Sequence, residues 1–97
     1  VDVYGYVYRG ISYMNLEQYS DAISDFDLAI KQYDKCAMAY FYKGFCYEKL
    51  GNLKLAKEQY YTAQTLIEHG YLQVEPYYEM FDEISGEMVA DQLDSIQ

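Results

Sequence analysis

The sequence carries the same pattern twice, displaced by 34 residues. When residues 3–36 are laid over residues 37–70, glycine falls on glycine and tyrosine on tyrosine. The identical pairs are Tyr6/Tyr40, Tyr8/Tyr42, Gly10/Gly44, Tyr13/Tyr47, Leu16/Leu50, Ala22/Ala56 and Ala29/Ala63. Self-similarity at a fixed period of this length predicts stacked structural units, each of which buries its apolar face against the next.

Within each copy the matched residues recur at helical spacing. Tyr40, Gly44 and Tyr47 lie four and three residues apart, which places them on one face of a helix. The mixture of rings with a residue that has no side chain lets two helix backbones approach closely. A glycine within a helix costs about 0.5–1 kcal/mol relative to alanine. Its recurrence at one site therefore predicts that close packing offsets this cost.

The order of residues in both copies is aromatic, small, aromatic, and then alanine, aromatic, alanine. The residues that carry it are Tyr6, Gly10, Tyr13, Ala22, Phe26, Ala29 and Tyr40, Gly44, Tyr47, Ala56, Tyr60, Ala63. This pattern resembles the tetratricopeptide repeat (TPR) family over residues 3–70. It departs from the family where Arg9 and Lys43 precede the glycines, a position that is usually apolar. It departs again at Asp34 and Glu68, where a proline often closes the repeat. The resemblance implies an all-α, right-handed superhelix of antiparallel helix pairs.

The pattern predicts four helices, over about 3–15, 20–33, 37–49 and 53–68. Ser20 is the expected N-cap of the second helix, because its hydroxyl can accept an unpaired backbone N–H. Gly51–Asn52 supplies a turn before the fourth helix, and His69–Gly70 ends that helix. In the second helix we expect the apolar residues to face inward. Asp21, Asp25, Asp27 and Lys31 are expected to face water.

After Gly70 the register of the repeat ends. Pro76 suits the first turn of a helix that reaches about Ile84. Apolar residues from Met88 to Ile96 predict a last helix of about ten residues, after an interruption at Ser85–Gly86. A third copy would require a small residue at the position of Tyr78. Residues 71–97 are therefore interpreted as a degenerate third repeat or a pair of capping helices.

The whole chain, residues 1–97, is expected to form one TPR-like domain, with repeats at 3–36 and 37–70. Helical patterning begins almost at Val1, so we expect the domain to be a piece of a longer protein.

Charge is distributed unevenly along the chain. The net charge is −9, and every Lys and Arg lies within residues 1–57. Without a basic stripe to neutralise phosphates, neither nucleic acid nor an anionic membrane is an expected partner. An acidic surface suits either a basic protein partner or simple solubility. No apolar run of membrane-spanning length is visible, and a cytoplasmic location is expected.

The residue types do not indicate an enzyme. His69 is the single histidine and follows a helix, where its charge suits the helix dipole rather than catalysis. Cys36 and Cys46 are expected to be reduced structural thiols, since there is no Cys/His set for zinc. The acidic group at residues 79, 82 and 83 is interpreted as a solvated helix face rather than a cation site. We expect no cofactor and no metal.

Several apolar residues remain on the first helix of each repeat after the packing seams are assigned. If the stack resembles the TPR family, these residues line a concave groove. The predicted groove residues are Tyr4, Val7, Tyr8, Ile11, Met14, Met38, Phe41, Tyr42, Phe45 and Lys49. Some TPR domains hold a carboxylate terminus in this groove with Lys, Arg and Asn. Val7, Ile11 and Tyr42 at the corresponding positions imply instead an extended or helical apolar segment.

The hypothesis from the sequence is a non-enzymatic protein–protein interaction module, in which Lys49 orients an acidic neighbour of the bound segment. An exposed apolar patch of this extent is typical of an interaction site. Two alternatives stay open. The groove is filled by the chain itself, for instance by the helix expected over 74–84, or it is closed by a second copy in a homodimer. In the latter case the chain is a structural oligomerisation unit.

Overall fold

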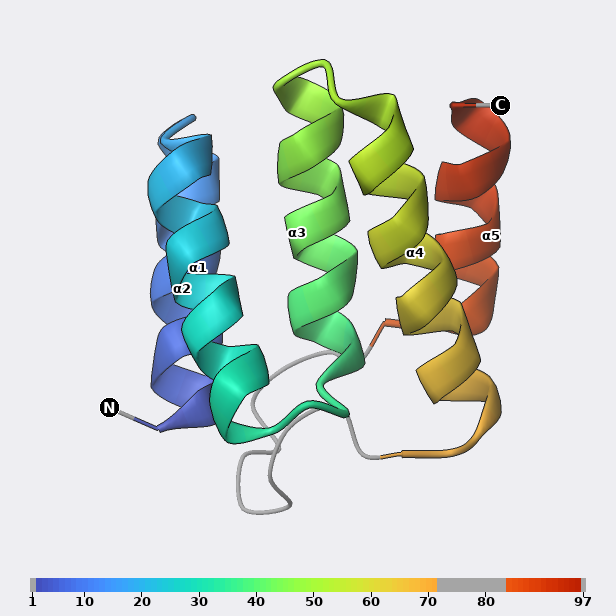
Figure 1. Cartoon of the computed structure of the whole chain (residues 1–97), viewed down its shortest axis with the longest axis horizontal. Helices are drawn as coiled ribbons and strands as arrows, with labels where there is room; N and C mark the ends of the chain where they lie inside the picture. The colour runs from blue at the N-terminus through green and yellow to red at the C-terminus, as the bar shows by residue number, and fades with distance from the viewer. Residues whose placement is uncertain (1, 72–83, 97) are drawn as a thin grey trace.

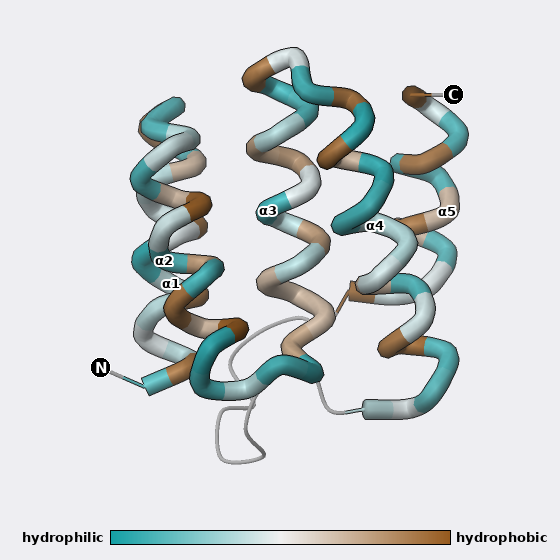
Figure 2. The backbone as a smooth tube through the Cα atoms, viewed as in Figure 1, coloured by the Kyte–Doolittle hydropathy of each residue, from teal (hydrophilic) through white to brown (hydrophobic). Residues whose placement is uncertain are grey.

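The computed structural model describes residues 2–71 and 84–96. Within these ranges the chain forms only helices, and no strand. They are α1 (Val3–Asn15), α2 (Tyr19–Gln32), α3 (Ala37–Lys49), α4 (Leu53–Glu68) and α5 (Gly86–Ser95). Figure 1 shows that successive helices run alternately up and down, and each packs against the one before it. In Figure 2, apolar and polar residues alternate around each helix, which is the pattern of helices that pack on one side.

The bounds of α1, α3 and α4 agree with the sequence prediction, and α2 begins and ends one residue earlier than predicted. The prediction that Ser20 caps α2 is wrong. Gln18 is the N-cap, and its carbonyl accepts the N–H of Ala22 at 3.0 Å, so Ser20 lies within the first turn. Asp2, Asn52 and Ser85 do cap their helices with side-chain oxygens.

The turns inside the two helix pairs share one backbone geometry. Glu17 has a φ angle of 61°, and Gly51, the residue at the same repeat position, has a φ angle of 84°. The first repeat therefore makes with glutamate the left-handed turn for which the second repeat uses glycine. This conformation strains a residue that carries a Cβ atom.

Each helix pair closes through a glycine that packs against a ring. A Cβ atom at Gly10 would lie 2.6 Å from Cε1 of Phe26, and one at Gly44 would lie 2.8 Å from Cε1 of Tyr60. Phe26 and Tyr60 are fully buried, and so are the alanines at spacings of four and three around them. The predicted packing of small residues against rings is therefore confirmed in both repeats.

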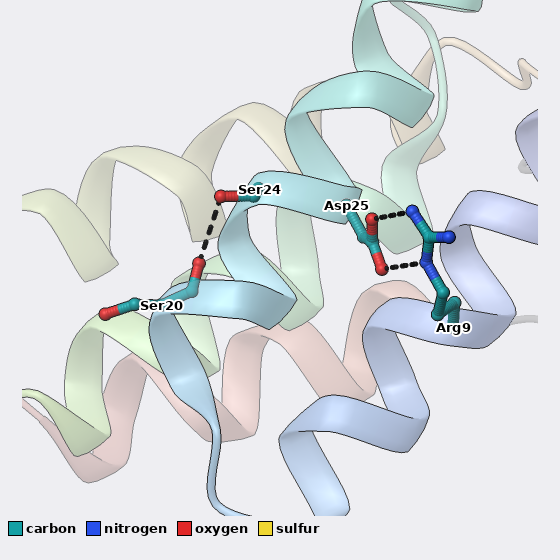
Figure 3. Close-up of polar contacts among 4 residues, drawn as sticks. All are labelled: Arg9, Ser20, Ser24 and Asp25. Atoms are coloured by element: carbon teal, nitrogen blue, oxygen red, sulfur yellow. Dashed lines mark hydrogen bonds and ion pairs between the residues drawn. The ribbon is translucent and has the colours of Figure 1, made fainter.

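The prediction that Asp25 faces water is wrong. The Asp25 carboxylate is 4% exposed, and both its oxygens accept hydrogen bonds of 2.7 Å from Nε and Nη2 of Arg9 (Figure 3). Burial of a carboxylate is tolerated when a guanidinium pairs with both oxygens. Arg9 stands where the resemblance to the TPR family leads one to expect an apolar residue, and this departure accounts for the buried charge. Asp21, Asp27 and Lys31 are exposed, as predicted.

Helix α5 lies against α4 and runs antiparallel to it (Figure 1). Val89 and Leu93 are buried there, and Ile84 just before the helix is 3% exposed. The predicted last helix of about ten residues is thus confirmed. The helix predicted from Pro76 and the acidic group at 79, 82 and 83 lie outside the described residues.

A polar contact joins α5 to both helices of the second repeat. Oε1 of Glu48 accepts a hydrogen bond from the Tyr60 hydroxyl and another from the Gln92 amide, each at 2.9 Å. The equivalent positions in the first repeat hold Met14 and Phe26, which have no group to share in such a contact. The two helix pairs are alike in the packing of glycine against a ring. They differ in that only the second pair has this polar contact with the helix that follows it.

Candidate functional site

The ten predicted groove residues lie on α1 and α3, and the structure divides them by burial. Three belong to the core: Val7 is 0% exposed, Met38 is 1% exposed and Phe41 is 7% exposed. The expectation that these three line an open groove is therefore corrected. Val7 shares its face of α1 with buried Val3 and Gly10, at spacings of four and three that place all three on one side. The packing face of α1 therefore includes Val3 and Val7 in addition to the predicted Tyr6, Gly10 and Tyr13.

Phe41 shows why the corresponding position of α3 is buried. Its ring centroid lies 5.5 Å from that of Tyr60 on α4 and 5.2 Å from that of Tyr42. Phe41 and Val7 occupy the same repeat position, so this position serves the core in both helix pairs.

The other predicted residues keep exposed surface. Tyr8 is 55% exposed, Lys49 is exposed, and the rest are half-buried: Tyr4, Ile11, Met14, Tyr42 and Phe45. Two of the repeat-related pairs, Tyr8/Tyr42 and Ile11/Phe45, are in this group. Because α1 touches α3, these pairs extend over two neighbouring helices. We call Tyr8, Ile11, Tyr42, Phe45 and Lys49 the α1–α3 face.

Ring contacts order several of these side chains. The ring of Tyr42 stacks on that of Phe26 in α2, with centroids 6.2 Å apart and an interplanar angle of 24°. The Nζ atom of Lys49 lies 5.2 Å from the centroid of Phe45, within the range of a cation–π contact. The positive charge of Lys49 is thus held over the ring of Phe45.

A shallow hollow of about 520 Å³ lies beside this face, on α1. Among the described residues it is lined by Tyr4, Gly5, Tyr8, Arg9 and Ser12. The rings of Tyr4 and Tyr8 form one side, with centroids 6.0 Å apart. Sequence reasoning missed Gly5, Arg9 and Ser12, because two of them are small and the third is charged. Their repeat equivalents are Ala39, Lys43 and Cys46, and only the structure shows that Ala39 and Cys46 are buried.

The basic residues at one repeat position form ion pairs on opposite sides of α2. Arg9 pairs with Asp25, and Nζ of Lys43 lies 2.6 Å from Oδ1 of Asp27. Hydrogen bonding to Asp25 and its negative charge raise the pKa of Arg9. Half of the Arg9 side chain remains exposed, whereas that of Lys43 is 15% exposed. Arg9 therefore presents a permanent positive charge at the hollow.

The two thiols are buried and unbonded to each other. Burial raises the pKa of Cys36 to about 11 and that of Cys46 to about 12. Both stay protonated near neutral pH, and a protonated thiol is neither a nucleophile nor a metal ligand. Among the residues that the structure describes, no three or more His, Cys, Asp or Glu side chains are grouped as metal ligands.

No protein-family model, curated protein or solved structure matches this chain. In the described ranges, each helix falls short of the length and apolar character that crossing a bilayer requires.

Proposed function

We propose that this chain is a TPR-like interaction module that binds an apolar peptide or helix segment on the α1–α3 face. The observation that carries the proposal is the pattern of exposure at repeat-related positions. The pairs Tyr8/Tyr42 and Ile11/Phe45 keep exposed surface on both helices, while the neighbouring position of Val7 and Phe41 is buried in both. A row of apolar side chains that keeps exposed surface in both repeats is the kind of surface that binds other proteins.

The TPR-like arrangement is part of the proposal. Both helix pairs close through the same contact, Gly10 with Phe26 and Gly44 with Tyr60. Since α3 packs against α2 and also touches α1, the first helices of the two pairs lie side by side. A right-handed superhelix of such pairs would give α1 and α3 a shared concave surface.

The chemistry of the face suits an apolar segment with an acidic residue. Tyrosine and phenylalanine supply a large contact area and have few rotamers to immobilise on binding. Lys49 stands over Phe45 at the end of the face, where it would pair with a carboxylate of the partner. Tyr8 contributes a ring with its hydroxyl at the opposite part of the face.

The test is selection from a peptide library displayed on phage, with the immobilised chain as the target. We expect enrichment of segments with aromatic or aliphatic residues. Phe45→Ala and Tyr8→Ala should each weaken the selected peptides by about 2 kcal/mol, or roughly 30-fold. Tyr61→Ala is the matched control, because Tyr61 is a 48% exposed tyrosine on α4, a helix that contributes no residue to the α1–α3 face.

The proposal fails if no sequence is enriched, or if peptides bind equally to Phe45→Ala, Tyr8→Ala and Tyr61→Ala. Sedimentation velocity of the chain alone identifies the alternative role, a structural oligomerisation unit. A dimer that Phe45→Ala dissociates would assign the face to self-association instead.

A further inference from the structure

Helix α3 is packed on two sides. Phe41 and Gly44 face α4. Lys43, which pairs with Asp27 of α2, marks the other side. Ala39 and Cys46 lie four and three residues from Lys43, hence on that same side, and both are 0% exposed. The side of α3 that packs against α2 thus carries a small residue, a basic residue and a second small residue.

Helix α1 presents the same pattern of residues with much more exposed surface. Gly5, Arg9 and Ser12 occupy the repeat positions of Ala39, Lys43 and Cys46. Gly5 is half-buried, and Arg9 and Ser12 are exposed. Among the described helices, α1 packs against α2 on its core side and touches α3. The side of α1 that corresponds to the α2-facing side of α3 is where the hollow lies.

The residues that line this hollow suit the packing of a helix. Gly5 and Ser12 are small and lie two helical turns apart, with the rings of Tyr4 and Tyr8 along one side. On α3 the same alternation of small and large residues lets α2 approach closely enough to bury Ala39 and Cys46 completely. Small residues on a packing side permit a short distance between helix axes.

The positive charge of Arg9 at the hollow predicts an acidic residue on the helix that docks there. On α3 the basic residue pairs with a carboxylate of the incoming helix, Asp27. On α1 the guanidinium of Arg9 gives Nε and Nη2 to Asp25, and it has five N–H donors in all. Half of this side chain is exposed beside the hollow, so its remaining donors can serve a carboxylate there.

We propose that the hollow on α1 is a docking site for an amphipathic helix of a partner protein. The hollow shares Tyr8 with the α1–α3 face, and its other lining residues, Tyr4, Gly5, Arg9 and Ser12, lie outside that face. The partner helix has the residue pattern of α2, with small and apolar residues on one side and an acidic residue that pairs with Arg9. It lies antiparallel to α1, as α2 lies to α3. Through the hollow the chain would extend a stack of helices, while Ile11, Tyr42 and Phe45 of the α1–α3 face stay available to a peptide.

The probe is a peptide with the sequence of residues 18–34 of this chain, which contains α2. Its helix is fixed by a hydrocarbon bridge between positions 28 and 32. Leu28 and Gln32 are exposed and one helical turn apart, and they lie on a different side of α2 from Asp27. Circular dichroism first establishes that the bridged peptide is helical, so that failure to bind reports on the site. Fluorescence anisotropy then measures binding to the whole chain.

The blocking variant is Ser12→Tyr, which puts a ring into the hollow. Ser24→Tyr in the whole chain is its matched control. Both serines are exposed, and each donates a hydrogen bond to the carbonyl four residues earlier, at 3.1 Å for Ser12 and 3.2 Å for Ser24. We expect saturable binding to the unmodified chain, a loss of about tenfold or more with Ser12→Tyr, and no change with Ser24→Tyr. The peptide variant Asp27→Asn should bind about fivefold more weakly, and Asp21→Asn should not.

Absence of binding by the helical peptide would overturn the proposal, and so would equal binding to Ser12→Tyr and Ser24→Tyr. Self-association of the chain that Ser12→Tyr abolishes would make a second copy the occupant and overturn the assignment to a partner protein. Phe45→Ala leaves the hollow intact, so peptide binding to that variant distinguishes a failure here from a failure of the α1–α3 face.

Discussion

The α-carbon of Gly44 lies so near the ring of Tyr60 that a Cβ atom at position 44 would come within 2.8 Å of ring carbon Cε1 and 2.9 Å of Cδ1. The ring has little room to move, because Tyr60 is 0% exposed and its hydroxyl donates a hydrogen bond to Glu48. A further contact, 3.1 Å to the backbone oxygen of Ala56, involves an atom that cannot rotate away.

Gly44→Ala should therefore destabilise the fold, although alanine is the better helix former by about 1 kcal/mol. We expect the free energy of unfolding in urea to fall by about 1–3 kcal/mol, the usual range for overpacking. Gly86→Ala is the control, since its nearest neighbour would be Cγ2 of Ile67 at 3.8 Å, an ordinary contact. Equal effects at the two glycines would contradict the packing of Gly44 against Tyr60.

The two left-handed turns predict opposite effects of substitution at one repeat position. Gly51→Ala puts a Cβ atom on a residue with a φ angle of 84° and should lower the free energy of unfolding by about 1 kcal/mol. Glu17→Gly relieves the same strain in the first repeat. It should raise this free energy by about 0.5 kcal/mol, after the greater freedom of glycine in the unfolded chain is subtracted. Urea denaturation followed by circular dichroism measures both, and a loss of stability in Glu17→Gly would refute the argument.

The ion pairs of Arg9 and Lys43 should differ in their contribution to stability. Arg9→Leu leaves the buried carboxylate of Asp25 without its bidentate partner and should cost about 2 kcal/mol of unfolding free energy. Lys43→Leu frees Asp27, whose side chain is 52% exposed, and should change the stability by less than about 1 kcal/mol.

The double variant Arg9→Leu, Asp25→Leu supplies the check on this reasoning. With both charges removed, no unpaired carboxylate remains in the core, and most of the lost stability should return. A double variant as unstable as Arg9→Leu would indicate that packing of the Arg9 side chain, not its charge, is what matters.

Stability should fall as the pH rises above 9. Burial raises the pKa of Cys36 from 9.0 to about 11 and that of Cys46 to about 12. Between pH 9 and those values the unfolded chain has lost these protons and the folded chain has kept them, so alkali favours unfolding. Each thiol should contribute a slope of about −1.4 kcal/mol per pH unit.

Urea titrations under reducing conditions from pH 8 to 10.5 measure this slope, and Cys46→Ala should make it shallower. Burial also raises the pKa of Tyr60, which adds to the decline above pH 10 in both proteins. A slope unaffected by removal of Cys46 would show that its thiol titrates alike in the folded and unfolded chain.

Contacts that depend on the spacing and size of neighbouring residues were predictable. Helices α1, α3 and α4 have the predicted bounds, since periodicity and terminal signals act locally. The contact of Gly44 with Tyr60 followed from a small residue and a ring recurring at the same offset. The TPR-like superhelix stays a prediction, because it is a matter of angles between helix pairs, which a sequence repeat does not specify.

The sequence by itself determined that this chain would form paired helices that close on glycine and a ring. Only the tertiary structure decided which of the remaining side chains are buried. It placed Val7 and Phe41 in the core, and it paired Asp25 with Arg9 from another helix. It also left Ser12 exposed where Cys46 is covered. The physical reason is that periodicity assigns a residue to a face of its own helix, whereas burial depends on whether another helix lies over that face.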